Sequence, residues 1–186
     1  TEPQRTNLPL PYAGRVRWDL LPGGRIAVGY SGKYEIEIFD PDKGRISSFE
    51  HGFNPVEITS ADKERFFQSI TFAYGSSSGG MTTGQRGAPD FMRKQTEFPK
   101  FKPSFQEITT DGDGNIWAQP YGAGEDAFAG FDAFDPAGKF LGRVGIVDGG
   151  AFPRTAVWIK GRFWTIRPSG DEGEYAIVKY RIEAAK

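Results

Sequence analysis

The sequence is poor in the residues that most often carry catalysis or covalent cross-links. It has no cysteine and one histidine in 186 residues, so disulfides and thiol catalysis are excluded. Lysine and arginine (23) nearly balance aspartate and glutamate (24), which leaves a net charge of −1 and no general attraction to nucleic acid or anionic lipid. No stretch approaches the roughly 20 apolar residues that span a bilayer. We therefore expect the protein neither to bind nucleic acid nor to insert into a membrane.

Long segments of helical periodicity are also nearly absent, whereas turn residues and phenylalanine are abundant. The chain holds 25 glycines, 13 prolines and 16 phenylalanines. This mixture is typical of many short strands joined by tight turns, and 186 residues suffice for one core. The composition predicts an all-β fold with residues 1–186 in a single domain.

A short glycine-led motif recurs along the chain. Gly24-Arg-Ile-Ala-Val28 aligns with Gly114-Asn-Ile-Trp-Ala118 and with Gly161-Arg-Phe-Trp-Thr165. A Phe-Asp-Pro turn follows the first two copies, at Phe39 and at Phe134. The second and third glycines are 47 residues apart, close to the roughly 40–50-residue period of propeller blades. The first and second are 90 apart, so an insertion separates those two copies.

Strand and turn signals outline three antiparallel blades, the last without a fourth strand. We place the blades at residues 13–50, 104–146 and 154–183, and the insertion at 51–103. The predicted strands include 105–110 in the second blade and 162–168 in the third. The insertion begins with a short helix that Thr59 or Ser60 can cap. It continues through a flexible passage rich in glycine and serine and returns through a basic segment.

These motifs resemble the six-bladed β-propellers of the NHL/gluconolactonase-like superfamily. The features that carry the resemblance are Asp-Gly-Asp-Gly-Asn-Ile-Trp117 and the two Phe-Asp-Pro turns, and the similarity covers nearly the whole chain. The chain looks most like the C-terminal half of bacterial secreted propellers. The resemblance implies a β-propeller of three four-stranded-type blades, half of a six-bladed ring, with one long insertion. It also implies an extracytoplasmic location, periplasmic or secreted.

Three blades are too few to close a ring, because propellers close with roughly 4–8 blades. An open wedge leaves an apolar sheet face at each end. We expect either a second copy or a missing N-terminal half to complete the ring. A less favoured alternative is a collapsed closure in which Leu8–Tyr12 pairs with Tyr175–Ile182.

Binding groups concentrate on loops over a rigid scaffold, so the face that carries the insertion is the expected binding face. Two loops joining second to third strands supply acidic and aromatic candidates, and two tryptophans on first strands can stack a sugar or ring. The candidate ligand-binding residues are Trp18, Tyr121, Glu125, Asp126, Trp158 and Asp171. Trp117 and Trp164 share one repeat position, and we expect them to pack between blades.

Other motifs favour structural roles. Asp111, Asp113 and Asn115 begin a calcium-like loop, but Gly122 stands where the bidentate glutamate belongs, so a hairpin turn is favoured. His51 has no nucleophile motif beside it and is expected in an exposed loop. Asp19 and Glu107 are the first-strand carboxylates that a lactonase-type calcium site would use.

The sequence favours a non-catalytic propeller module that binds or scaffolds within a protein assembly. We assign no catalytic residue, no metal ligand and no cofactor, with Ca²⁺ as the alternative. Two other functions stay open: a metal-dependent, lactonase-type hydrolase that is active only in a completed ring, and a carbohydrate-binding propeller.

Overall fold

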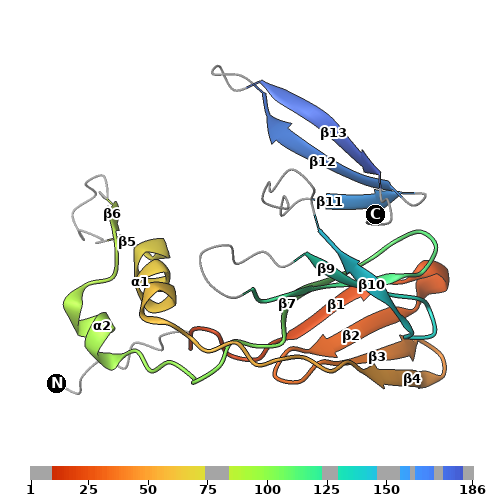
Figure 1. Ribbon diagram of the computed structural model, residues 1–186, viewed down its shortest axis with the longest axis horizontal. Coiled ribbons are helices and arrows are strands. Elements are labelled where there is room, and N and C mark those ends of the chain that lie inside the picture. The colour runs from red at the N-terminus through yellow and green to blue at the C-terminus, as the bar shows by residue number, and fades with distance from the viewer. Residues whose placement is uncertain are drawn as a thin grey trace. The chain divides into compact units, whose positions relative to one another are not determined.

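The computed structural model describes residues 10–73, 84–122, 130–145, 156–159, 162–169 and 174–181 (Figure 1). The chain divides into two compact units. One comprises Pro55–Lys102 together with the chain's start up to Ala13, and the other comprises Gly14–Asn54 and Pro103–Lys186. The predicted insertion at 51–103 nearly coincides with the long segment of the first unit.

Antiparallel β-sheets make up the larger unit, so the predicted all-β class is confirmed for it. Three sheets have the strand orders β1-β2-β3-β4, β10-β9-β8-β7 and β11-β12-β13, and we call them the first, second and third sheets. Their strands are β1 (Val16–Leu20), β2 (Ile26–Tyr30), β3 (Glu35–Asp40), β4 (Gly44–Glu50), β7 (Phe105–Thr110), β8 (Ile116–Pro120), β9 (Phe131–Phe134), β10 (Phe140–Val144), β11 (Ala156–Ile159), β12 (Arg162–Pro168) and β13 (Tyr175–Arg181).

Each sheet forms from hairpins between strands that are consecutive in the chain. Several of the connections are tight turns: η1 (Pro22–Gly24) follows β1, and the two Phe-Asp-Pro turns follow β3 and β9. In both of those turns the aspartate, Asp40 or Asp135, accepts hydrogen bonds from backbone N–H groups two and more residues ahead. These Asx turns explain why the repeated motif marks the same corner in each sheet.

The first and second sheets pack face to face over one apolar core. Ala27, Ile36 and Ile38 of the first sheet lie in one buried cluster with Phe105 and Ile116 of the second. Gly29 permits the close approach, because a Cβ there would lie 2.8 Å from Phe105 Cζ.

A second buried cluster joins the second and third sheets. Trp117, Phe131 and Ala133 contribute from the second sheet and Phe163 from the third, with Tyr180 packed beside them. The second sheet is therefore covered on both of its faces.

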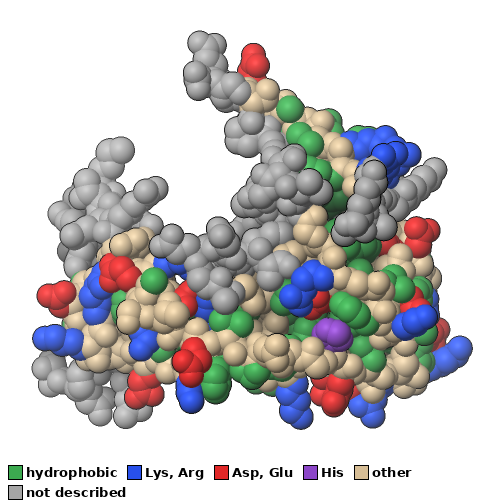
Figure 2. All heavy atoms as spheres, in the orientation of Figure 1, with side chains coloured by type: hydrophobic (Ala, Val, Ile, Leu, Met, Phe, Trp, Pro, Cys, Tyr) green, Lys and Arg blue, Asp and Glu red, His purple; other side chains and the backbone are tan. Residues whose placement is uncertain are grey.

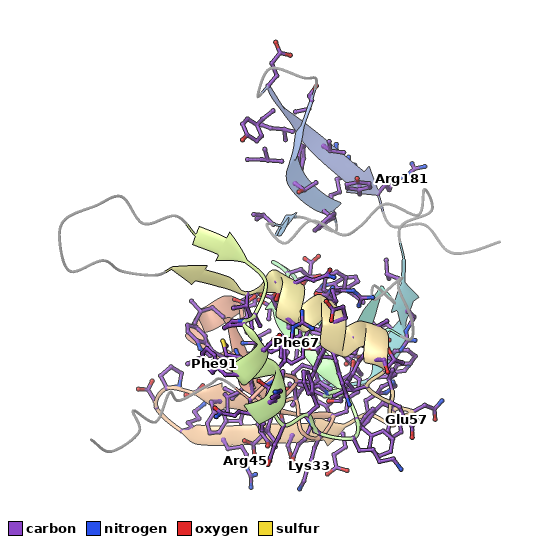
Figure 3. The ribbon with its side chains drawn as sticks, turned by 90° about the vertical axis from the view of Figure 1, so that its left-hand side faces the viewer. Lys33, Arg45, Glu57, Phe67, Phe91 and Arg181 are labelled. Atoms are coloured by element: carbon purple, nitrogen blue, oxygen red, sulfur yellow. The ribbon has the colours of Figure 1, made fainter. Side chains whose placement is uncertain are left out.

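Among the described residues, the α-helices lie in the smaller unit. It contains α1 (Ser60–Ser69), β5 (Thr71–Ala73), β6 (Gly84–Arg86) and α2 (Asp90–Gln95), with β5 and β6 paired as a hairpin. Phe67 of α1 and Met92 of α2 are buried in its core, and Figure 3 shows Phe67 on α1 and Phe91 on α2. Thr59 is the N-cap of α1 and forms a capping box with Asp62, so Thr59 rather than Ser60 caps this helix.

Candidate interaction surfaces

The strands of the second sheet point alternate side chains to opposite neighbours. On β8, Ile116 and Ala118 belong to the cluster shared with the first sheet, and Trp117 belongs to the cluster shared with the third. Trp117 is only 5 % exposed, as expected for a residue that packs between sheets. Because Trp164 holds the same repeat position on β12, its side chain lies on the face of the third sheet away from the second.

In the described part of the chain, the outer face of the first sheet is exposed and apolar along β1. We call it the β1 face. Val16 is 60 % exposed, Trp18 62 % and Leu20 58 %, and Tyr30 of β2 is 49 % exposed beside them. In the ladder, Val16 pairs with Tyr30, which places both on one side of the sheet.

The outer face of the third sheet, as far as its residues are described, is exposed in the same way, and we call it the β13 face. Val157, Ile166, Ile177 and Tyr175 are 57 %, 56 %, 74 % and 73 % exposed. Ile166 pairs with Ile177 across β12 and β13, so these side chains share one face. Several large apolar groups side by side on each end sheet mark interaction surfaces rather than scattered exposure.

A buried polar contact crosses the interface between the first and second sheets. Tyr34 Oη donates a 2.8 Å hydrogen bond to Asp132 Oδ2, and Asp132 is fully buried. Arg143 of β10 binds the same carboxylate with Nε at 2.7 Å from Oδ1 and Nη2 at 3.1 Å from Oδ2. Burial raises the pKa of Tyr34 well above its ordinary value, and the negative charge of Asp132 raises it further. The tyrosine therefore stays a donor, and the contact joins the two sheets.

His51 lies next to this contact and corrects the prediction of an exposed loop histidine. Its ring is half-buried, with its centroid 5.0 Å from that of Tyr34 and 4.5 Å from that of Phe140. Its backbone N–H donates to the carbonyl of Tyr34 at 2.9 Å. Aromatic packing at the end of β4 holds the imidazole, so His51 packs against the edge of the core instead of extending into solvent.

The Asp-Gly-Asp-Gly-Asn segment is a hairpin turn, as the sequence predicts. Asp111 Oδ1 accepts from the backbone N–H groups of Asp113 (3.0 Å) and Asn115 (2.8 Å). Its Oδ2 accepts from Asn115 Nδ2 at 2.8 Å and from Trp117 Nε1 at 3.1 Å. The buried carboxylate is thus used to close the turn and to orient the tryptophan.

The two first-strand carboxylates differ in their surroundings. Asp19 Oδ2 accepts from the backbone N–H of Thr110 at 2.7 Å and from the hydroxyl of Thr109 at 3.2 Å, which ties β1 to β7. Glu107 of β7 is exposed. Within the residues described, no three His, Asp or Glu side chains come together as a metal-binding group.

The structure describes three of the six candidate ligand-binding residues and does not gather them in a loop site. Trp18 lies on the β1 face, Tyr121 is half-buried at a bridge after β8, and Trp158 lies in β11 opposite Phe163 of β12. Burial raises the pKa of Tyr121 above its ordinary value, while the charges of Arg17 and Arg15 oppose the rise. The other three, Glu125, Asp126 and Asp171, lie outside the described residues.

The residues of the β1 and β13 faces, apart from Trp18, were not among the predicted binding residues, because binding groups were expected mainly on loops. The available signal was the alternation of apolar residues along the two end strands, Val16-x-Trp18-x-Leu20 and Tyr175-x-Ile177. Alternation alone cannot tell whether a neighbouring sheet covers such a face.

No protein-family model matches the chain, and no curated protein matches it either. No helix in the described part of the chain combines the length and apolar character needed to cross a membrane.

Proposed function

We propose that the chain is a non-catalytic binding or scaffold module, built as half of a six-bladed β-propeller and acting within a protein assembly. The observation that supports this is the stack of three antiparallel sheets whose middle member is buried on both faces and whose end members are not. Blades of a propeller stack in this way, and each needs a neighbour on either side. The loops and the 51–103 insertion are the proposed binding elements.

The hydrogen bonds of the carboxylates also favour a binding module over a hydrolase. Asp19, Asp111 and Asp132 each accept several hydrogen bonds from neighbouring protein groups. A lactonase-type centre instead needs carboxylate oxygens that converge on a divalent cation. We also propose an extracytoplasmic location, which rests on the resemblance to secreted propellers.

Metal binding and turnover separate the module from the hydrolase. Terbium luminescence and calcium calorimetry on the purified chain are expected to show no saturable binding at metal concentrations up to the millimolar range. Lactones and esters assayed with and without Ca²⁺ are expected to show no turnover. Saturable binding together with turnover that EDTA abolishes would replace the module by the lactonase-type enzyme.

The exposure of Trp18, which is 62 %, favours the carbohydrate-binding alternative, because an exposed aromatic ring can stack on a sugar. Titration with a panel of glycans, followed by tryptophan fluorescence, tests it. A saturable change that disappears in Trp18→Ala would assign a sugar site to the β1 face. We expect no such change, because Trp18 lies on β1 among other exposed apolar side chains, Val16 and Leu20.

A further inference from the structure

We propose that two copies of this chain pair head to tail, with the β13 face of each copy docked on the β1 face of the other. In each contact the Tyr175 hydroxyl of one copy donates to the Glu37 carboxylate of the second copy. The inference rests on the proposed propeller architecture and goes further by naming the occupant of both faces and the polar contact that selects it.

The interface between the first and second sheets supplies the template. There a tyrosine just before the third strand of one sheet, Tyr34, donates to a carboxylate on the third strand of the next, Asp132. An arginine from the fourth strand, Arg143, holds that carboxylate. A tyrosine, a carboxylate and an arginine together form a strong contact, because one charged acceptor serves both donors.

Tyr175 occupies the position of Tyr34 in the third sheet. Ala27 and Trp164 share a repeat position, and their ladder partners are Ile38 and Lys179. Four residues before these partners come Tyr34 and Tyr175. Side chains four residues apart on a strand point to the same face, so Tyr175 lies on the β13 face as Tyr34 lies on the face toward the second sheet.

Glu37 occupies the position of Asp132 in the first sheet. Each acid stands two residues before the phenylalanine of a Phe-Asp-Pro turn. Glu37 pairs with Val28 and Asp132 pairs with Ala118, residues that also share a repeat position.

Glu37 already has its fourth-strand arginine. Arg45 Nη1 lies 2.6 Å from Glu37 Oε1, as Arg143 binds Asp132. Of the three-part contact, the β1 face therefore carries the acid and the arginine, and the β13 face carries the tyrosine.

This polar contact is not repeated at every sheet-to-sheet interface. In the third sheet the residue equivalent to Asp132 is Val178, which pairs with Thr165. The second and third sheets therefore meet without a carboxylate at this position. The contact distinguishes the correct partner face from a merely apolar one, as buried polar pairs can do.

The remaining features of the two faces are complementary. The β1 face offers Val16, Trp18 and Leu20, and the β13 face offers Val157, Ile166 and Ile177, all more than half exposed. The β13 face carries basic residues, Arg162 and Lys179, and Figure 2 shows blue and green side chains together over β12 and β13. Across the first sheet, Glu35, Glu37 and Glu50 supply the opposite charge. Opposite charges beside matched apolar areas favour this pairing over face-to-face pairing of like faces.

A second copy also allows a closed dimer with twofold symmetry. One head-to-tail contact would leave a face open at each end and invite open chains of copies. Two copies related by a half-turn use both faces of both chains and close. Three sheets from each copy then give six, a number within the range at which propellers close.

Mass in solution by light scattering on the full chain is the first measurement. We expect twice the 20.6 kDa of one chain. Trp18→Glu and Ile177→Glu, one on each face, are each expected to give monomers. Mixing the two variants should restore a dimer, because the intact β13 face of the first can dock on the intact β1 face of the second. Pairing of like faces predicts that one variant stays dimeric and that mixing restores nothing.

The polar contact is tested by Tyr175→Phe and Glu37→Gln, which preserve shape. Each dimer contains two such bonds of about 1 kcal/mol, so each variant should weaken dimerisation by roughly tenfold to a hundredfold. Glu107→Gln is the control and should leave dimerisation unchanged. Since the chain lacks cysteine, Glu37→Cys and Tyr175→Cys add unique thiols, and a short bismaleimide should link the mixed pair and neither variant alone.

A monomer at high micromolar concentration that unfolds cooperatively would refute the second copy and leave the binding module standing. A dimer that the Glu37 and Tyr175 substitutions leave unchanged would also overturn the proposed contact. Metal-dependent turnover, in contrast, would refute the module itself whatever the mass in solution.

Discussion

Asp132 is the residue on which the packing of the first two sheets depends most directly. Its carboxylate is fully buried and serves both Tyr34 and Arg143. In Asp132→Ala the buried tyrosine hydroxyl loses its acceptor, whereas the half-exposed arginine can turn to water. We therefore expect a loss of about 3 kcal/mol, the lower end of the range for a broken buried pair.

Tyr34→Phe separates the two donors at this site. It removes the hydroxyl and leaves Asp132 bound by Arg143, so a loss of about 1 kcal/mol is expected. Glu107→Ala, at an exposed carboxylate of β7, should change the free energy of unfolding by less than about 0.5 kcal/mol. Urea unfolding of the three variants measures their free energies of unfolding and so ranks the losses. Equal losses for Asp132→Ala and Glu107→Ala would show that the Asp132 carboxylate does not stabilise the contact between the two sheets.

A buried ion pair has the corresponding role in the smaller unit. Lys102 Nζ lies 2.8 Å from Asp62 Oδ1, and both side chains are almost completely buried. Lys102→Met leaves the carboxylate with Arg65, 3.2 Å away, as its remaining charged partner and should cost about 3 kcal/mol, the lower end of the range for a broken buried pair. Lys100→Met is the matched control, because Lys100 pairs with Glu57 at 3.7 Å in solvent and should cost less than about 1 kcal/mol. Hydrogen exchange of the α1 amides reports the difference.

The same pair determines how the unit responds to acid. Burial alone raises the pKa of Asp62, but hydrogen bonds from Lys102 and Thr59 outweigh it and hold that pKa below its ordinary value. A lowered carboxyl pKa stabilises the fold above the unfolded-state value of about 3.9, and this contribution is lost as the pH falls through the folded-state value. The acid loss of α1 protection should be smaller in Lys102→Met than in the parent chain.

At the scale of elements, the turn glycines of the two Phe-Asp-Pro corners offer a matched pair. Gly44 and Gly138 both have positive φ, at 75° and 85°. A Cβ at Gly44 would meet nothing within 4 Å, whereas one at Gly138 would collide with the ring of Phe49 in the first sheet. Gly44→Ala should therefore cost only the strain of a left-handed alanine, about 1–2 kcal/mol.

Gly138→Ala adds the collision with Phe49 to the same backbone strain and should cost at least about 1 kcal/mol more than Gly44→Ala. Thermal unfolding of both variants measures the difference. In the Phe49→Ala background, Gly138→Ala should cost no more than Gly44→Ala if the collision is the cause of the extra loss. Equal losses in the two single variants would mean that the corner does not pack on the first sheet.

The strands were the most predictable elements, because Gly, Pro and Asp mark both of their ends. The predicted β7 and β12, 105–110 and 162–168, agree with the structure to the residue. The sequence did not predict α2, because six residues are too few to show helical periodicity. For α1 it left Thr59 and Ser60 open, since choosing the cap requires knowing that the Thr59 hydroxyl accepts from the Asp62 N–H.

At the scale of the whole molecule, the sequence predicted uncovered end faces but not the residues on them. Alternating strands such as Val16–Leu20 look the same whether a neighbour covers one face or both. The aromatic packing of His51 could not be predicted for a related reason, because its neighbour Phe140 comes from a strand almost 90 residues later. Contacts between sheets depend on the stacking order, which no local pattern contains.

Attachment of the third sheet tests the stack as a whole. Phe163 is 2 % exposed in the cluster that joins this sheet to the second, so Phe163→Ala should cost about 3–5 kcal/mol at any protein concentration. Ile166 points to the opposite face of β12 and is 56 % exposed. In dilute solution Ile166→Ala should therefore cost less than about 1 kcal/mol.

Concentration then separates the two sides of this one strand. If a second copy covers the β13 face, the melting temperature of the parent chain rises with protein concentration, because association stabilises the folded state by mass action. Ile166→Ala should flatten that rise, whereas Phe163→Ala should lower the whole curve. Melting curves across a wide range of protein concentrations measure both effects. Parallel curves for parent and Ile166→Ala would place Ile166 outside any interface, and a small loss for Phe163→Ala would mean that the third sheet is not packed on the second.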